Sequence, residues 1–422
     1  MRDKLQHIKS LWSNNSKVAE NYLFMTSLQV AVILINLLLY PYLIRTLGKE
    51  SYGTYIFILA NVQLFVLFFA SGFSFPAIKK ISLNADKLQI KNQTISEVFT
   101  AKFILFGFCA VALAVCIFFV PFVRENMLIY ILIFATSALG DTLFPLWYFQ
   151  GMQKMSFVTY VNLAWRIASI PLIFIFVKSP VDLLVYVIIA SVLPFCGNLF
   201  SFFYLRMKEK INVKFVAVKT LKPVFKDTVP FYWTSAFSRL KNEGVQFIIG
   251  IFWGMNNVAI YDLAHKIISI AGIFTNSINT AVFPKAIQNL SPKKIKQIFR
   301  YETIIGLTVT ALIILFGYWA VLLLGGKEML TAYPLTIILS FTIYFSLMVG
   351  CYVNYIFVPQ NHYYFVSKNQ LVSFVSFCVF TLIGFAFYVN IITLVVAITL
   401  SQFFEMLYCN YLTRKHKLMS SE

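Results

Sequence analysis

Long apolar runs recur along the whole chain, separated by short polar stretches. Each is long enough to cross about 30 Å of hydrocarbon at about 1.5 Å per helical residue. Because lipid offers no hydrogen-bond partner to the backbone, such runs predict helices rather than open strands. We predict twelve spans, at residues 22–44, 53–75, 99–120, 127–149, 157–177, 182–205, 230–253, 258–282, 303–324, 332–357, 366–388 and 391–411.

The composition supports an all-α integral membrane protein. Of the 422 residues, 59% are hydrophobic and only 12% are charged, whereas ordinary soluble domains have about 25% charged residues. The first run is longer than the core of a signal peptide and has no small-residue cleavage site after it, so we expect it to be retained as a helix. The six cysteines lie singly in apolar stretches, which predicts neither disulfides nor a metal site.

The net charge is +19, and the distribution of the basic residues follows the predicted membrane topology. Most lysines and arginines fall in the N-terminal segment and in every second loop, and this bias predicts that both termini are cytoplasmic. The basic charge thus orients the chain and does not indicate nucleic acid as a partner. The opposite loops hold only Arg45, Lys49, Arg124, Lys178 and Lys327.

The two halves of the chain echo each other. Residues 48–55 and 254–261 both read G-x-x-x-x-[GA]-x-Y, and Phe-Pro follows the next span at 75–76 and at 283–284. Matches in nearly one register predict an internal repeat, with tight glycine turns and prolines that end helices. Six spans per half give a parallel repeat, which places a substrate site between two bundles. The predicted parts are an N-terminal cytoplasmic segment, a first lobe, a basic cytoplasmic linker, a second lobe and a cytoplasmic tail, at 1–21, 22–205, 206–229, 230–411 and 412–422.

The seventh predicted span carries Arg239, Lys241 and Glu243. Three central charges cost about 8 to 10 kcal/mol on an insertion scale, and the apolar residues of the span return only about 3 to 5 kcal/mol. The charged side must therefore face other helices or water. Arg239 and Glu243 are four residues apart and share a helix face, whereas Lys241 points elsewhere. Two interpretations stay open, namely structural ion pairs or a water-filled cavity with a positive lining.

Other spans also contain ionisable residues. Arg166 lies in the middle of one span, and Lys266 follows Asp262 by four residues, so that the acid could neutralise it. Lys102 lies near a predicted cytoplasmic end, where its side chain can extend to the surface. Guanidinium and ammonium groups suit phosphate and carboxylate, which implies an anionic cargo. The predicted substrate-binding residues are Arg166, Arg239, Lys241 and Lys266.

Acids within the spans are candidates for proton or sodium coupling or for gating, as an alternative to hydrogen bonding inside a helix bundle. Asp141 stands four residues before Pro145, where a kink could free backbone carbonyls for a cation. The candidates are Asp141, Glu243, Asp262 and Glu405.

Three motifs carry a family resemblance. They are "PYLIRTLGKESYGTY" at 41–55, "YFQGMQKM" at 148–155 and "VFPKAI" at 282–287. Together they resemble the O-antigen, or Wzx-type, flippases of bacterial polysaccharide biosynthesis, within the superfamily that also holds the multidrug exporters of MATE type.

The resemblance implies two six-helix lobes around a central cavity that opens alternately to either side of the bacterial inner membrane. The implied substrate is an oligosaccharide on undecaprenyl diphosphate, whose diphosphate or acidic sugars would meet the cations named above. Membrane lipid, a proton or sodium ion and polysaccharide assembly proteins are the other implied partners.

Two other classes of function remain as alternatives. A drug or cation antiporter of the same superfamily is expected to favour acids over bases in its cavity. A polysaccharide polymerase or lipid-linked glycosyltransferase is expected to carry a large periplasmic loop with catalytic groups. We find no such loop, no paired carboxylates, no Ser-His-Asp set and no glycine-rich phosphate loop. We therefore expect a protein that is not an enzyme and has no catalytic residues, cofactor or metal.

Overall fold

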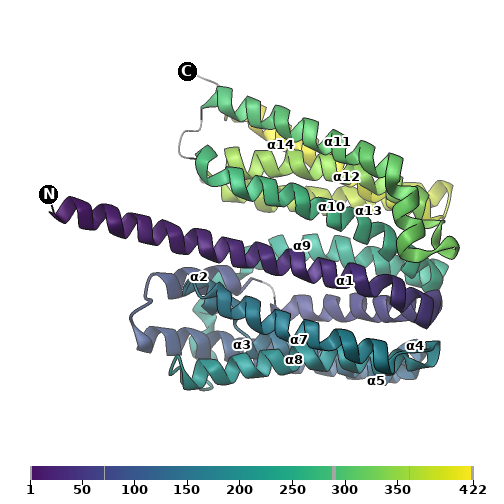
Figure 1. The fold of residues 1–422 in the computed structure, drawn as a ribbon, viewed down its shortest axis with the longest axis horizontal. Coiled ribbons are helices and arrows are strands. Elements are labelled where there is room, and N and C mark those ends of the chain that lie inside the picture. Colours follow the sequence, from purple (N-terminus) through teal and green to yellow (C-terminus); the bar gives the residue numbers. More distant parts are fainter. Residues whose placement is uncertain (1, 71, 288–290, 361, 420–422) are drawn as a thin grey trace. The chain divides into compact units, whose positions relative to one another are not determined.

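The computed structural model describes residues 2–70, 72–287, 291–360 and 362–419. Those residues are helical almost throughout and contain no strand, which confirms the predicted all-helical class (Figure 1). The α-helices are α1 Arg2–Ala70, α2 Ser74–Ser82, α3 Leu88–Phe119, α4 Pro121–Glu125, α5 Met127–Leu143, α6 Leu146–Gly151, α7 Met155–Phe176, α8 Leu183–Met207, α9 Lys222–Trp253, α10 Met255–Ile287, α11 Pro292–Gly325, α12 Ala332–Tyr352, α13 Tyr363–Phe387 and α14 Ile391–Lys415. Shorter elements are η1 Pro180–Asp182, η2 Val218–Leu221, η3 Lys327–Met329 and the π-turn η4 Val353–Phe357.

Within the described residues, nine helices are long and apolar enough to cross a membrane. One of them, Val30–Phe68, contains parts of the first two predicted spans. Helices α9 and α10 are not among the nine, and they carry the charges at 239, 241, 243, 262 and 266. The seventh and eighth predicted spans are thus helices in the structure, and they carry five charged side chains.

Two glycines mark the turns that the repeat predicted. Gly48 interrupts α1 with φ 77° and ψ 166°, so that residues 2–47 and 49–70 are separate helical runs. Gly254, between α9 and α10, also has φ 77°. A Cβ at either position would meet nothing within 4 Å, so the left-handed backbone and not lack of space calls for glycine. The glycine turns are confirmed, whereas Pro284 does not end a helix as predicted, because α10 continues through it to Ile287.

The chain divides into two compact units. The first contains Met1–Leu39 and Phe65–Tyr232, and the second contains Tyr40–Leu64 and Trp233–Glu422. Residues around Gly48 therefore group with the second unit, although they precede the first one's main part in the sequence. In the second unit α12 packs against α10, α11 and α14, and α13 packs against α14.

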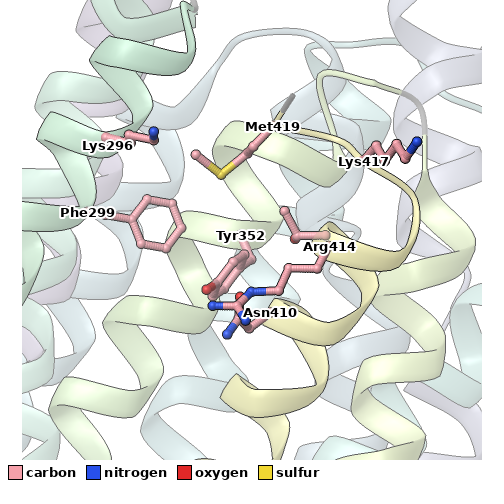
Figure 2. A pocket seen from close by; sticks show the side chains of 8 residues that line it. Lys296, Phe299, Tyr352, Asn410, Arg414, Lys417 and Met419 are labelled. Carbon is pink, nitrogen blue, oxygen red and sulfur yellow. The ribbon is translucent and has the colours of Figure 1, made fainter. Parts of the chain in front are cut away.

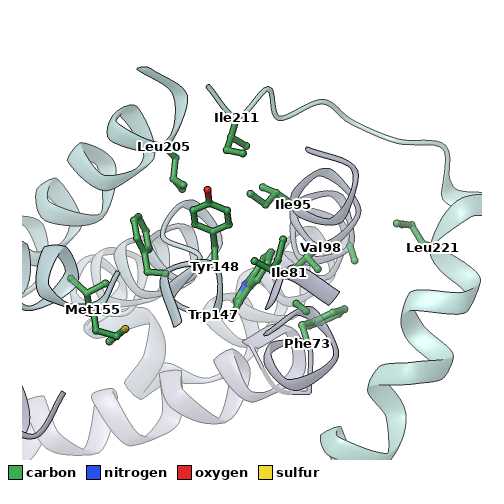
Figure 3. Packing of buried hydrophobic residues seen from close by; sticks show 14 residues of the cluster. Phe73, Ile81, Ile95, Val98, Trp147, Tyr148, Met155, Leu205, Ile211 and Leu221 are labelled. Carbon is green, nitrogen blue, oxygen red and sulfur yellow. The ribbon is translucent and has the colours of Figure 1, made fainter. Parts of the chain in front are cut away.

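The first unit is built around aromatic residues and includes the basic linker. Tyr148 and Phe149 are fully buried, and Leu205, Ile211 and Leu221 join the same cluster (Figure 3). The chain folds back after α8, and the N–H of Ile211 in the linker donates to the carbonyl of Leu205 at 3.1 Å. Leu205 therefore lies beside the linker. The linker thus buries apolar side chains of its own in this unit.

The backbone of the linker also forms hydrogen bonds with side chains spaced one turn apart along α3. The N–H groups of Asn212, Lys214 and Val216 donate to the side chains of Asn92, Ser96 and Thr100, at 3.0, 3.1 and 3.1 Å. Two residues of extended chain rise about 6.6 Å and four residues of helix rise about 6 Å, so the two repeats match. Polar side chains one turn apart on α3 therefore satisfy alternate amides of the linker.

Candidate substrate site

Lys266 of α10 is surrounded by one acid and two tyrosines of the second unit. It pairs with Asp262 one turn earlier and donates to the Tyr52 hydroxyl, which itself donates to Asp262 at 3.3 Å. The ammonium lies 4.4 Å from the ring centre of Tyr40 and 5.0 Å from that of Tyr52. A cation held by ring faces in this way is stabilised without being fully neutralised.

Of these four side chains, that of Lys266 is partly exposed. The Lys266 side chain is 29% exposed, whereas Asp262, Tyr40 and Tyr52 are buried. The predicted pairing of Lys266 with Asp262 is present in the structure. The tyrosines were not predicted, because a sequence with 23 tyrosines gives no sign of which of them meet a lysine. Lys266 is thus the more accessible member of its pair with Asp262.

Lys241 belongs to a closed polar network between α9, α13 and α14. Its ammonium donates to the Ser373 hydroxyl at 2.6 Å and lies 3.7 Å from the Glu405 carboxylate. The same carboxylate accepts from Asn369 at 2.8 Å and from Gln370 at 3.1 Å. Both charged side chains are only 6% exposed. The structure therefore joins two predicted site residues as a buried pair that connects three helices.

Arg239 and Glu243 have a different setting on α9. Arg239 is exposed and Glu243 is half-buried. The six ion pairs among the described side chains do not include either of them. The two residues share one helix face, which Lys241 does not. Within the second unit, Arg239 is thus the most accessible of the predicted cations.

Arg166 lies in the first unit, on α7. It is half-buried and borders a small cavity with Asn162 and Trp165 of its own helix and Gly197 of α8. The cavity measures about 10 Å³, which is room for about one water molecule. Gly197 is needed there because a Cβ would lie 2.4 Å from the Trp165 ring. A ligand for Arg166 would have to approach from outside this cavity.

Asp141 of α5 pairs with Lys102 of α3 at 2.6 Å. The Lys102 side chain is only 3% exposed, so the prediction that it extends to the membrane surface is wrong. The predicted break at Pro145 is present, since α5 ends at Leu143 and α6 begins at Leu146. The acid therefore already has a cation from its own chain.

Metal ligation has no candidate in the part of the chain that the structure describes, where no group of three His, Cys, Asp or Glu side chains could hold an ion. The six cysteines are free thiols.

Comparison with known sequences gives the family. The polysaccharide biosynthesis protein family matches residues 18–290. A protein of Escherichia coli (strain K12) named "Putative O-antigen transporter" is 24% identical over 318 residues, which cover 75% of each chain. A protein of the same name from Shigella dysenteriae is 26% identical over 315 residues, covering 73% of this chain and 78% of the relative.

Comparison with solved structures gives the fold. The lipid II flippase MurJ in an inward closed conformation has a TM-score of 0.73, with 12% identity over 94% of this chain and 87% of MurJ. An inward-facing multidrug resistance MATE family transporter of the MOP superfamily has a TM-score of 0.63, with 14% identity over 93% of this chain and 100% of the transporter. The chain belongs to the polysaccharide biosynthesis protein family, as its motifs indicated, and it shares the fold of MurJ and the MATE transporters.

Proposed function

We propose that this protein is a flippase that moves an oligosaccharide linked to undecaprenyl diphosphate, such as an O-antigen repeat unit, across the bacterial inner membrane by alternating access. Family membership over residues 18–290 is the observation that carries the proposal. The two O-antigen transporter relatives and the fold shared with a lipid II flippase support it.

In this proposal the cations of the membrane helices receive the diphosphate or acidic sugars. Each phosphate charge moved bare through hydrocarbon would meet a large desolvation penalty, which Arg239 and Lys266 of the second unit and Arg166 of the first would reduce. Arg239 and Lys266 are the most favourable candidates because their side chains are accessible. Lys241, also a predicted ligand, instead holds α9 to α13 and α14 through Glu405 and Ser373.

Asp262 is the acid best suited to coupling. It shares Lys266 with the proposed substrate, so a phosphate that draws the ammonium away would leave a buried carboxylate without its cation. Such a carboxylate takes up a proton or sodium ion to restore neutrality. Glu243, half-buried on α9, is the second candidate, whereas Asp141 and Glu405 are occupied by lysines.

The topology that goes with this function has twelve membrane helices in two parallel six-helix repeats with both termini in the cytoplasm. The equal φ of 77° at Gly48 and Gly254 supports the repeat, because a glycine with positive φ stands at equivalent positions of the two halves. The distribution of lysine and arginine supports the orientation.

Complementation of a strain that lacks the gene tests the proposal. Arg239→Ala is expected to abolish surface polysaccharide while the membrane abundance of the protein holds, and Arg239→Lys to restore part of it, since the charge survives without the forked geometry. Arg124→Ala, which removes an exposed arginine outside the charged helices, is the matched control. Normal polysaccharide in the double variant Arg166→Ala, Arg239→Ala would remove these residues from the site.

A drug or cation antiporter is the second candidate, because the MATE transporters share the fold. It predicts that deletion of the gene raises drug susceptibility and leaves surface polysaccharide unchanged. Measuring both in one deletion strain separates the two functions.

A further inference from the structure

A second basic site lies in the second unit, where α14 ends. A cavity of about 530 Å³ lies between side chains of α11, α12, the last turns of α14 and the residues that follow it. Figure 2 shows the side chains that line it. It is lined by Lys296, Phe299, Tyr352, Asn410, Thr413, Arg414, Lys417 and Met419. None of these residues was a predicted site residue, and none belongs to the clusters described above.

The lining has three cations and no acid. Arg414 extends from α14 towards Tyr352 and Asn410, and Lys296 extends from α11 towards the same space (Figure 2). The six ion pairs among the described side chains leave out both residues. A guanidinium fork with an ammonium, an amide and a phenol nearby matches the oxygens of a phosphate group.

The rim of the cavity is formed by a turn that ends α14. The N–H of Leu418 donates to the Thr413 carbonyl at 3.0 Å and that of Lys417 to the Arg414 carbonyl at 3.2 Å, while Gln360 donates to the Leu418 carbonyl at 3.1 Å. Lys417 occupies the left-handed position of this turn, with φ 50°, where glycine is the usual residue. Lys417 is therefore a residue of the cavity lining with a strained backbone.

We propose that this cavity binds a phosphate group, either as the headgroup of an anionic membrane lipid or as a free phosphate. The charge bias predicts that this end of the helices faces the cytoplasm, where basic pockets between membrane helices meet anionic headgroups. The site stands apart from the substrate cations of α9 and α10, so it holds whether or not the chain is a flippase.

Binding to the full chain in phosphatidylcholine nanodiscs tests the proposal, with phosphatidylglycerol and inorganic phosphate as separate probes and the thermal midpoint as the readout. Phosphatidylglycerol is expected to raise the midpoint, and Arg414→Ala and Lys296→Ala each to weaken its binding by about tenfold, as for the loss of a charged hydrogen bond. An effect of the lipid alone identifies a headgroup site, and an equal effect of inorganic phosphate identifies a free-phosphate site.

The matched controls are Lys293→Ala and Lys415→Ala, which remove exposed cations from the same two helices outside the lining. They are expected to bind as the parent does. Lys417→Gly removes a rim charge while relieving the left-handed backbone, so it is expected to weaken binding with no loss of stability. Equal weakening in lining and control variants, or unchanged binding in both Arg414→Ala and Lys417→Gly, would overturn the site, as would the absence of binding by either probe.

Discussion

Lys102 binds Asp141 twice, at its carboxylate with a distance of 2.6 Å and at its main-chain oxygen with 3.3 Å. The residue four positions after Asp141 is Pro145, which has no N–H to offer that oxygen. The ammonium therefore donates to the carbonyl oxygen at the end of α5 that a residue with an N–H at position 145 could otherwise have satisfied. The break between α5 and α6 is stabilised by a cation from α3, and Asp141, a candidate for ion coupling or for bonding inside the bundle, pairs with this lysine.

The two partners are expected to respond unequally to mutation. Lys102 is 3% exposed and Asp141 is 39% exposed. Asp141→Leu leaves a buried ammonium without its acid, which costs about 3 kcal/mol or more. Lys102→Met leaves a carboxylate that water can reach, and is expected to cost less. Thermal midpoints of the purified variants check the order, with substitution of the exposed Lys79 of α2, Lys79→Met, as the control; a larger loss in Lys102→Met would contradict this picture.

Lys241 and Glu405 are expected to behave as a structural pair. Removing either charge alone leaves the other buried, at a cost of about 3 to 5 kcal/mol, whereas replacing both by apolar residues is often nearly neutral. Lys241→Met and Glu405→Leu should therefore each lower the thermal midpoint, and the double variant should recover most of the loss. Surface polysaccharide should recover with it. A double variant that is stable but makes no surface polysaccharide would indicate that Lys241 binds the substrate.

The helical fold follows from the sequence because run length and apolar composition leave the backbone no alternative in lipid. The turn at Gly254 was predictable because the residue pattern around Gly48 recurs there. Depth within a helix was harder to predict. The third span was expected to begin at residue 99, but α3 begins at Leu88, so Lys102 lies about four turns inside the helix and cannot reach its end.

The candidate site was predictable only where it is local. Lys266 and Asp262 pair because they are four residues apart on one helix. The partners of Lys241 lie more than a hundred residues away on α13 and α14, and their identity depends on which helices pack together. The sequence predicts that such a partner exists, because a lone buried ammonium is too costly, but it does not identify the residue.

Glycine substitutions test the two left-handed turns. Gly48→Ala and Gly254→Ala are each expected to lower stability by about 1 to 2 kcal/mol, because an L-residue strains in that conformation. Nothing crowds either position, so the backbone alone sets the effect. Gly244→Ala is the control, since it lies inside α9 with open space around it and should raise stability by up to about 1 kcal/mol. A loss at Gly48 without one at Gly254 would contradict the equivalence of the two turns.

Thiol labelling distinguishes cations that face water from those locked in the bundle. In a background without native cysteines, Arg239→Cys and Lys266→Cys are expected to react with a charged, membrane-impermeant reagent, because the native side chains are exposed and partly exposed. Lys241→Cys is expected to stay unmodified, since its site is closed by Ser373 and Glu405. Labelling of intact cells and of inverted vesicles samples both sides of the membrane. If positions 239 and 266 are as unreactive as position 241 from both sides, these cations do not face water and serve only to join helices. That result would contradict the proposed hydrated path for an anionic headgroup.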